Sequence, residues 1–252
     1  MLLTVDVGNT TVAAAVFRGK AIVFRNRMPT PRCWTSRAFA SLLPSPWPGR
    51  VTAAVVSSVV PRLDRPVGAA IRRDCAARPL FLDARTDAGL PLRIDRPSEL
   101  GADRIADCLG ALALFPAPLV IIDSGTAITF DLVDRAGAYR GGCILPGIGI
   151  AVQGLADHAA RLPRVAFTVP RSPLGRNTAD SIRAGVFYGT AGALGHLIAL
   201  YRRRLGARTT VVATGGMMGL FRGRVPGIDA FAPDLIFIGM RRVHERLAGR
   251  RG

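Results

Sequence analysis

Short apolar runs separated by turn residues characterise the start of the chain. Residues 2–5 and 11–17 are apolar, and Gly8-Asn9 stands between them. Gly19-Lys20 then precedes a further apolar segment at residues 21–25. Runs of this length bounded by Gly and Asn are typical of hairpins, so we expect three antiparallel strands at the start.

Apolar positions next alternate between strand and helix spacing as far as residue 114. The spacing predicts helices over residues 36–43, 63–76 and 101–114. Shorter apolar runs predict strands over residues 53–60 and 80–83. Such alternation is typical of an α/β layer arrangement.

The second half begins as the first does. An apolar run at residues 119–122 ends at Asp123, Ser124-Gly125-Thr126 follows, and strands are expected at 127–133 and 139–144. Laid on the first hairpin, Asp6 falls on Asp123 and Gly8 on Gly125. This internal repeat predicts two duplicated domains, residues 1–115 and 116–252. The remaining predicted elements are a helix over 178–204, strands over 209–213 and 235–238, and a closing helix from Met240.

The two hairpin turns have the chemistry of phosphate-binding loops. Successive backbone N–H groups in a glycine turn can cradle phosphate oxygens. A carboxylate beside phosphates is favourable only when a cation bridges the charges, so Asp6 and Asp123 are candidates for cation-linked roles. One such turn is ordinary, but here two turns are followed by Thr214-Gly215-Gly216, where a strand is expected to enter a helix that starts at the glycine pair. Together they predict a nucleotide gripped between facing turns across a cleft.

Composition narrows the class of protein. The formal net charge is +17, but the arginines are scattered, aromatic residues make up 6%, and Lys20 is the only lysine. A codon bias towards arginine therefore explains the charge better than nucleic-acid binding. The four cysteines form no CxxC pair, which favours reduced thiols in the cytosol over a zinc site. The uncharged residues 184–201 are expected to form a helix at a core or subunit interface rather than a membrane span.

The ordered motifs resemble the two phosphate motifs and the adenosine motif of the actin-like ATPase superfamily. Within it, the chain is most similar to the type III pantothenate kinase family. The resemblance rests on seven segments in order: Asp6-Val7-Gly8-Asn9-Thr10, Ser57-Ser58-Val59-Val60-Pro61, Gly101-Ala102-Asp103-Arg104, Asp123-Ser124-Gly125-Thr126-Ala127, Gly141-Gly142-Cys143-Ile144-Leu145-Pro146-Gly147, Asn177-Thr178 and Thr214-Gly215-Gly216.

This resemblance implies two ribonuclease-H-like domains whose mixed sheets are flanked by helices. It implies a cytoplasmic homodimer that phosphorylates pantothenate to 4'-phosphopantothenate with ATP, the first step of coenzyme A biosynthesis. It further implies Mg²⁺ and a monovalent cation, K⁺ or NH₄⁺, as cofactors. Neither a nucleic acid nor a membrane is expected as a partner.

The resemblance also implies residue roles. Asp123 would bind the monovalent cation, Asp6 would take part in metal binding, and Asp103 would accept the proton of the substrate hydroxyl. The residues expected to bind ATP are Asp6, Val7, Gly8, Asn9, Thr10, Thr11, Val12, Ala13, Thr126, Gly215 and Gly216. Those expected to bind pantothenate are Ile94, Gly101, Ala102, Asp103, Arg104 and Thr178.

Four positions depart from the family pattern. Ile94 stands where the family usually has a pantothenate-contacting Tyr, and Arg96 stands at a nearby position that is commonly Asn. Ala156 and Ala159 stand where the family often has His and Thr. These departures cluster on the acceptor side, so a kinase of the same fold acting on another small alcohol remains an alternative. The basic charge leaves open a second one, a catalytically weakened regulatory homologue.

Overall fold

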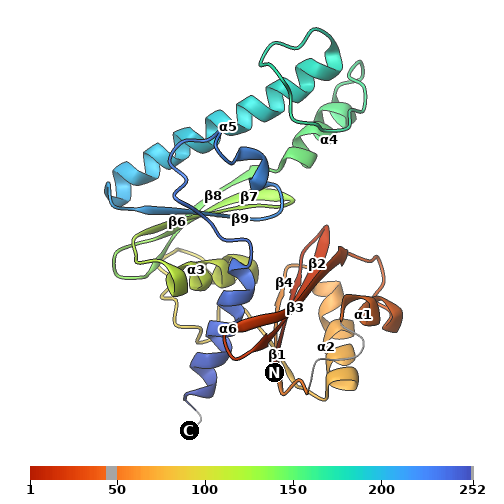
Figure 1. Ribbon diagram of the computed structural model, residues 1–252, viewed down its shortest axis with the longest axis vertical. Helices are drawn as coiled ribbons and strands as arrows, with labels where there is room; N and C mark the ends of the chain where they lie inside the picture. Colours follow the sequence, from red (N-terminus) through yellow and green to blue (C-terminus); the bar gives the residue numbers. More distant parts are fainter. Residues whose placement is uncertain (44–49, 251–252) are drawn as a thin grey trace. The chain divides into compact units, whose positions relative to one another are not determined.

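The computed structural model describes residues 1–43 and 50–250 (Figure 1). Within them the chain forms two compact units, the first containing Met1–Leu114 and the chain from Asp234 onward, the second Phe115–Pro233. The boundary between Leu114 and Phe115 lies one residue from the domain limit expected from the sequence. The C-terminal segment, which the sequence placed in the second half, packs with the first unit.

Unit 1 is built on a five-stranded mixed sheet with the order β3-β2-β1-β4-β5. Strand β1 pairs antiparallel with β2 and parallel with β4, so it lies near the centre of the sheet. The predicted opening hairpins are confirmed, and each strand is as long as or longer than expected, except β4 and β5. The strands are β1 (Leu2–Val7), β2 (Thr11–Arg18), β3 (Ala21–Pro29), β4 (Ala53–Ser58) and β5 (Pro79–Phe81).

Helices cover both faces of this sheet (Figure 1). Helices α1 (Ser36–Leu42) and α2 (Pro61–Cys75) pack on one face and bury the apolar side chains of β1, β2 and β4. Helices α3 (Ala102–Leu114) and α6 (Leu235–Ala248) pack on each other and on β4. Both faces of β1 are thereby shielded, which explains its continuous apolar run.

Helix α6 corrects one prediction. Residues 235–238 were expected to be a strand, but they form the first turn of α6. A four-residue apolar run does not distinguish a strand from a buried helix turn. Glycines let α6 pack closely on α3. A Cβ atom on Gly239 would collide with the carbonyl oxygen of Ala106 in α3, and one on Gly110 would collide with that of Leu235.

Unit 2 repeats the same architecture. Its five-stranded sheet has the order β10-β9-β6-β7-β8, with β6 antiparallel to β7 and parallel to β9. Strands β6 and β7 therefore correspond to β1 and β2, which confirms the duplication read from the sequence. The strands are β6 (Leu119–Ser124), β7 (Ala127–Val133), β8 (Tyr139–Pro146), β9 (Thr210–Thr214) and β10 (Ala230–Phe231).

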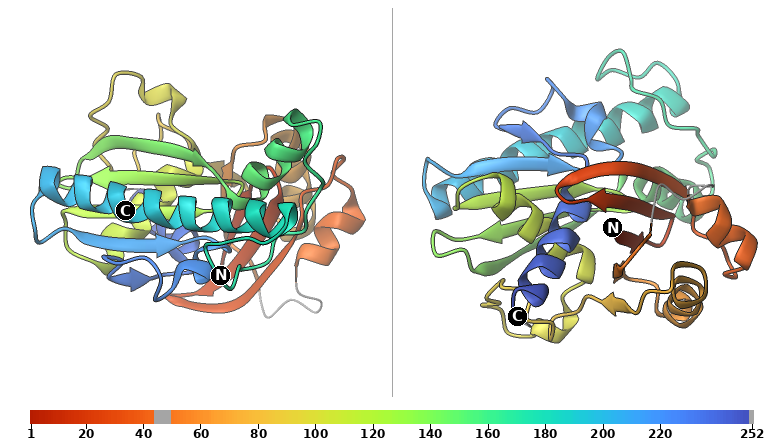
Figure 2. Two further views of the ribbon diagram at one scale, coloured as in Figure 1. Left: turned by 90° about the horizontal axis from the view of Figure 1, so that it is seen from above. Right: turned by 60° about the horizontal axis from the view of Figure 1, so that its bottom comes forward.

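One face of the second sheet carries the long helix α5 (Thr178–Leu205), as Figure 1 and the left view of Figure 2 show. Asn177 caps this helix by accepting a hydrogen bond from the backbone N–H of Asp180. Helix α4 (Ile148–His158), which the sequence did not predict, packs against α5. Unit 2 also contains a short 3₁₀ helix, η2 (Met218–Phe221).

Helix α5 is only partly buried in the single chain. By length and apolar composition it is the one helix in the described part of the chain that could cross a membrane, but only 22% of its apolar window is buried. Phe187, Leu194 and Ile198 of α5 nevertheless lie in the core of unit 2, so one side of the helix is a core element as expected. A subunit interface stays a prediction.

Candidate functional site

The first phosphate turn, Gly8 to Thr11, joins β1 to β2. The backbone N–H of Gly8 donates to the carbonyl oxygen of Thr11 at 3.0 Å, which closes the turn. A Cβ atom on Gly8 would lie only 3.0 Å from that same oxygen, so a larger residue would push the turn open. The turn is thus tight, and Asn9 and Thr10 are exposed at its tip.

Asp6 lies at the end of β1, directly before this turn. In the sheet it is paired with Ala13 on β2 and Ser57 on β4. The Ser57 hydroxyl donates to Asp6 Oδ1 at 3.0 Å, and Ser57 is fully buried. The Asp6 carboxylate is therefore held in one orientation by a buried hydroxyl group.

Asp103 lies in the first turn of α3, where a carboxylate is favourable. The backbone N–H of Arg104 donates to Asp103 Oδ1 at 2.8 Å. Gly101 makes room for this arrangement, because a Cβ atom there would collide with the same Oδ1 and lie 3.5 Å from Val59 Cγ1. Val59 directly follows β4. The segment Gly101-Ala102-Asp103-Arg104 therefore lies at the edge of the first sheet where β1 and β4 end.

Burial raises the pKa of the Asp103 carboxyl above its ordinary value, and the backbone N–H and charge of Arg104 oppose this in part. A carboxylate with a raised pKa binds a proton more readily than an exposed one. Asp103 therefore has the property that a general base requires.

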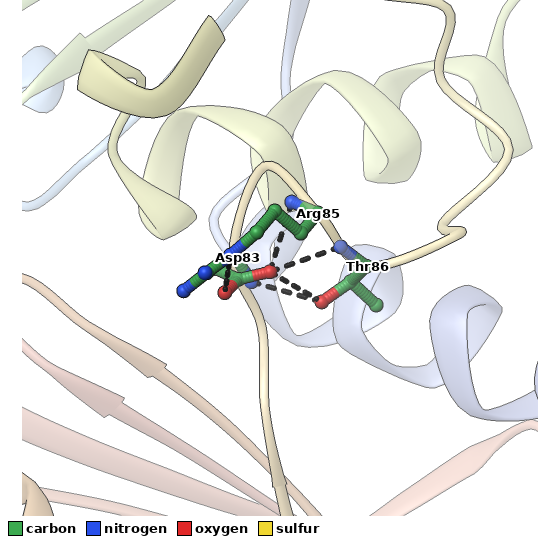
Figure 3. A network of polar contacts seen from close by, with 3 residues as sticks. All are labelled: Asp83, Arg85 and Thr86. Carbon is green, nitrogen blue, oxygen red and sulfur yellow. Dashed lines mark hydrogen bonds and ion pairs between the residues drawn. The ribbon is translucent and has the colours of Figure 1, made fainter.

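Ile94 lies half-buried in the loop between β5 and the short 3₁₀ helix η1 (Pro97–Glu99). Asp83 organises the start of this loop (Figure 3). Its Oδ1 accepts the backbone N–H groups of Arg85 and Thr86, both at 2.9 Å, and the Thr86 hydroxyl at 3.0 Å. Although burial acts to raise the pKa of the Asp83 carboxyl, these hydrogen bonds hold it below its ordinary value.

The second phosphate turn, Gly125 and Thr126, joins β6 to β7. Gly125 N–H donates to the carbonyl oxygen of Ala127 at 2.9 Å. Gly147, just after β8, donates its N–H to the carbonyl oxygen of Thr126 at 3.1 Å. A Cβ atom on Gly147 would collide with that oxygen, so glycine permits the close approach.

The Gly215 segment packs directly on the second turn. Asp123 pairs with Thr214 between the parallel strands β6 and β9. Gly215 has φ +89°, and a Cβ atom there would collide with Asp123 Oδ1 and the backbone of Ser124. Met217 N–H donates to the carbonyl oxygen of Ser124 at 3.2 Å. Two motifs that are distant in sequence therefore form one structure.

The chain beyond Gly216 differs from the expectation. A helix was predicted to start at the glycine pair, but only the four-residue 3₁₀ helix η2 follows. So short an element supplies no aligned helix dipole. If this segment binds a ligand, it must do so through close approach of its backbone to the ligand rather than through a helix dipole.

Thr178 begins α5 and lines a cavity of about 550 Å³ within unit 2. A second cavity of about 240 Å³ includes Ala156 and Arg164. The sequence gave no signal for these cavities, because α4 was not predicted. The residues around the larger one are Ala151, Leu155, Leu162, Thr178, Ser181, Ile182, Gly185 and Val186.

The sequence profile of the type III pantothenate kinase family matches residues 2–200. The chain belongs to the type III pantothenate kinase family. A type III pantothenate kinase of Thermomicrobium roseum is 37% identical over 98% of each chain, and one of Phenylobacterium zucineum is 38% identical over 98% of each. Kinases of this family phosphorylate pantothenate with ATP in coenzyme A biosynthesis, and this chain is such a kinase.

Solved structures agree on the fold of the kinase. A putative Baf family transcriptional activator from Campylobacter jejuni has a TM-score of 0.61 at 19% identity, covering 98% of this chain and 99% of its own. A putative 2-dehydro-3-deoxygalactonokinase from Sinorhizobium meliloti has a TM-score of 0.61 at 12% identity with the same coverage. These likenesses show the fold alone, which is two ribonuclease-H-like units, each with a mixed sheet flanked by helices.

Proposed function

We propose that Asp103 is the general base of pantothenate phosphorylation. In this proposal Asp103 takes the proton of the 4'-hydroxyl while the oxygen forms its bond to the γ-phosphorus of ATP. The bond from that phosphorus to the bridging oxygen breaks at the same time and releases ADP. The observation that carries the proposal is the half-buried Asp103 carboxylate, which accepts the Arg104 N–H beside a glycine that leaves it room.

The ATP phosphates would be bound by the first phosphate turn together with Asp6, Val7, Val12 and Ala13, and by Thr126 of the second turn. The first turn leaves no room for a larger residue at Gly8, and Gly147 packs closely on the second, which suits close approach of backbone N–H groups to phosphate oxygens. Gly215 and Gly216 would contact the nucleoside. The packing of Gly215 against Asp123 supports joint action of these residues.

Asp6 would take part in Mg²⁺ binding, and Asp123 would hold K⁺ or NH₄⁺. Among the described residues there is no group of three or more His, Cys, Asp or Glu side chains suited to hold a metal. Mg²⁺ needs no such group, because it is commonly held by one or two carboxylates, phosphate oxygens and water. When bound, Mg²⁺ neutralises charge on the phosphates.

Arg104 would pair with the carboxylate of pantothenate, since a guanidinium matches that group in a bidentate fork. Gly101 and Ala102 would place the substrate against the start of α3, with Ile94 and Thr178 as further contacts. We also propose that the kinase is a cytoplasmic homodimer. The apolar helix α5, which is only partly buried in the single chain, supports the dimer.

The variant Asp103→Asn tests the base assignment. Asn keeps the acceptor oxygen for Arg104 N–H but cannot take a proton at neutral pH. We expect kcat to fall by about 10²- to 10⁴-fold. In the wild-type enzyme the rate should fall as the pH drops through the raised pKa of Asp103, where the base becomes protonated.

The same substitution separates catalysis from folding. Because burial raises the pKa of Asp103, its charge destabilises the folded state above the ordinary carboxyl pKa, and that cost is relieved at lower pH. Asp103→Asn should therefore melt at pH 7 no lower than the wild type. Full activity in a folded Asp103→Asn protein would refute the assignment.

The second candidate function is phosphorylation of another small alcohol. It is favoured by Ala156, whose small side chain lines the cavity of about 240 Å³ at a position where a larger polar residue is expected. Ile94 also lacks a hydroxyl for a substrate hydrogen bond. A panel of small alcohols compared with pantothenate separates the two candidates.

A further inference from the structure

Thr30 is joined to the first phosphate turn from outside it. It follows the last residue of β3, and its backbone N–H donates to the carbonyl oxygen of Thr10 at 3.0 Å. Its hydroxyl donates to the carbonyl oxygen of Gly8 at 2.6 Å. One partly buried residue thus holds two carbonyl groups of the turn.

The hydroxyl contact fixes the direction of an N–H group. In a planar trans peptide, the C=O of one residue and the N–H of the next point in opposite directions. The bond from Thr30 to the Gly8 carbonyl oxygen therefore directs the N–H of Asn9 away from Thr30. Asn9 lies exposed at the tip of the turn.

Two further carbonyl groups at the turn also accept hydrogen bonds. Val59 N–H donates to the Val7 oxygen at 3.1 Å, and Gly8 N–H donates to the Thr11 oxygen. With the carbonyl oxygens of Val7, Gly8, Thr10 and Thr11 all accepting from protein donors, an approaching anion meets less negative charge. Such a turn is organised to favour anionic ligands.

We infer that Thr30 is a positioning residue for ATP, whose hydroxyl aims the Asn9 N–H at a phosphate oxygen by holding the Gly8 carbonyl. This inference rests on the proposed function, because the first phosphate turn must be the site of the ATP phosphates. Thr30 itself contacts no substrate in this scheme. It acts only through the turn.

The test compares Thr30→Val, which keeps the shape and removes the hydroxyl, with Thr30→Ser, which keeps the hydroxyl. Binding of Mg-ATP and of adenosine is measured by calorimetry on the full chain without pantothenate. Thr30→Val should weaken ATP binding about three- to tenfold and raise the KM for ATP by a similar factor. Adenosine binding and the KM for pantothenate should not change. Thr30→Ser should retain wild-type ATP binding.

A purely structural role predicts a different result, namely equal weakening of ATP and adenosine or a lower melting temperature alone. ATP binding by folded Thr30→Val within twofold of the wild type would overturn the inference, and so would a loss in Thr30→Ser. If Thr30→Val does not fold, Thr30→Cys, a weak donor of similar size, takes its place with the same expected loss. A wild-type chain that binds no ATP would instead contradict the proposed function.

Discussion

Asp123 and Gly215 are far apart in the sequence but are in contact in unit 2 because β6 and β9 are parallel neighbours. Two conditions require glycine at position 215: a φ of +89° and the nearness of Asp123 Oδ1. At the scale of single residues, the candidate site therefore depends on glycines, which have no side chain, as much as on its polar side chains. The sequence revealed the glycine motifs but could not reveal which atoms they approach.

Gly215→Ala should lower the free energy of unfolding by about 1–2 kcal/mol or more, because a side chain is strained at this φ and collides with Asp123. Urea denaturation measures the change. Gly219→Ala in the adjacent 3₁₀ helix is the matched control, since its Cβ atom would meet no atom within 4 Å. Equal stability of the two variants would show that Gly215 is not constrained as described.

Most strands and helices could be predicted because their apolar spacing is regular. Residues 127–133 match β7, and residues 178–204 match α5 to within one residue. Helix α4 was missed because it contains two glycines, Gly149 and Gly154, which are weak helix formers, and because it lacks a polar N-terminal cap. The run at 235–238 was read as a strand because only packing on α3 reveals its helical state.

The crossing of α6 and α3 yields a prediction for these elements. Gly239→Ala should destabilise the first unit by about 1–3 kcal/mol, since its methyl group would collide with the backbone of α3. Hydrogen exchange should then increase in β1 and β4, on which α6 packs. Gly249→Ala at the end of the same helix makes only ordinary contacts and should leave exchange unchanged. Faster exchange confined to unit 2 would contradict the placement of α6.

At the scale of the whole molecule, the duplicated motifs were the most informative feature of the sequence. Asp6 and Asp123 occupy equivalent strand ends in two sheets of the same order, as their alignment predicted. The two cavities of unit 2 were less accessible to prediction. They depend on α4 and on the chain around Leu162, whose positions follow from packing rather than from any local pattern.

Initial rates of ADP release with purified protein, Mg-ATP and either K⁺ or NH₄⁺ test the central claim most directly. Pantothenate is compared with a panel of other small alcohols at equal concentration. We expect ADP release that depends on pantothenate and has its highest kcat/KM with that substrate. A higher kcat/KM with another alcohol, or no pantothenate-dependent release from folded protein, would contradict the account.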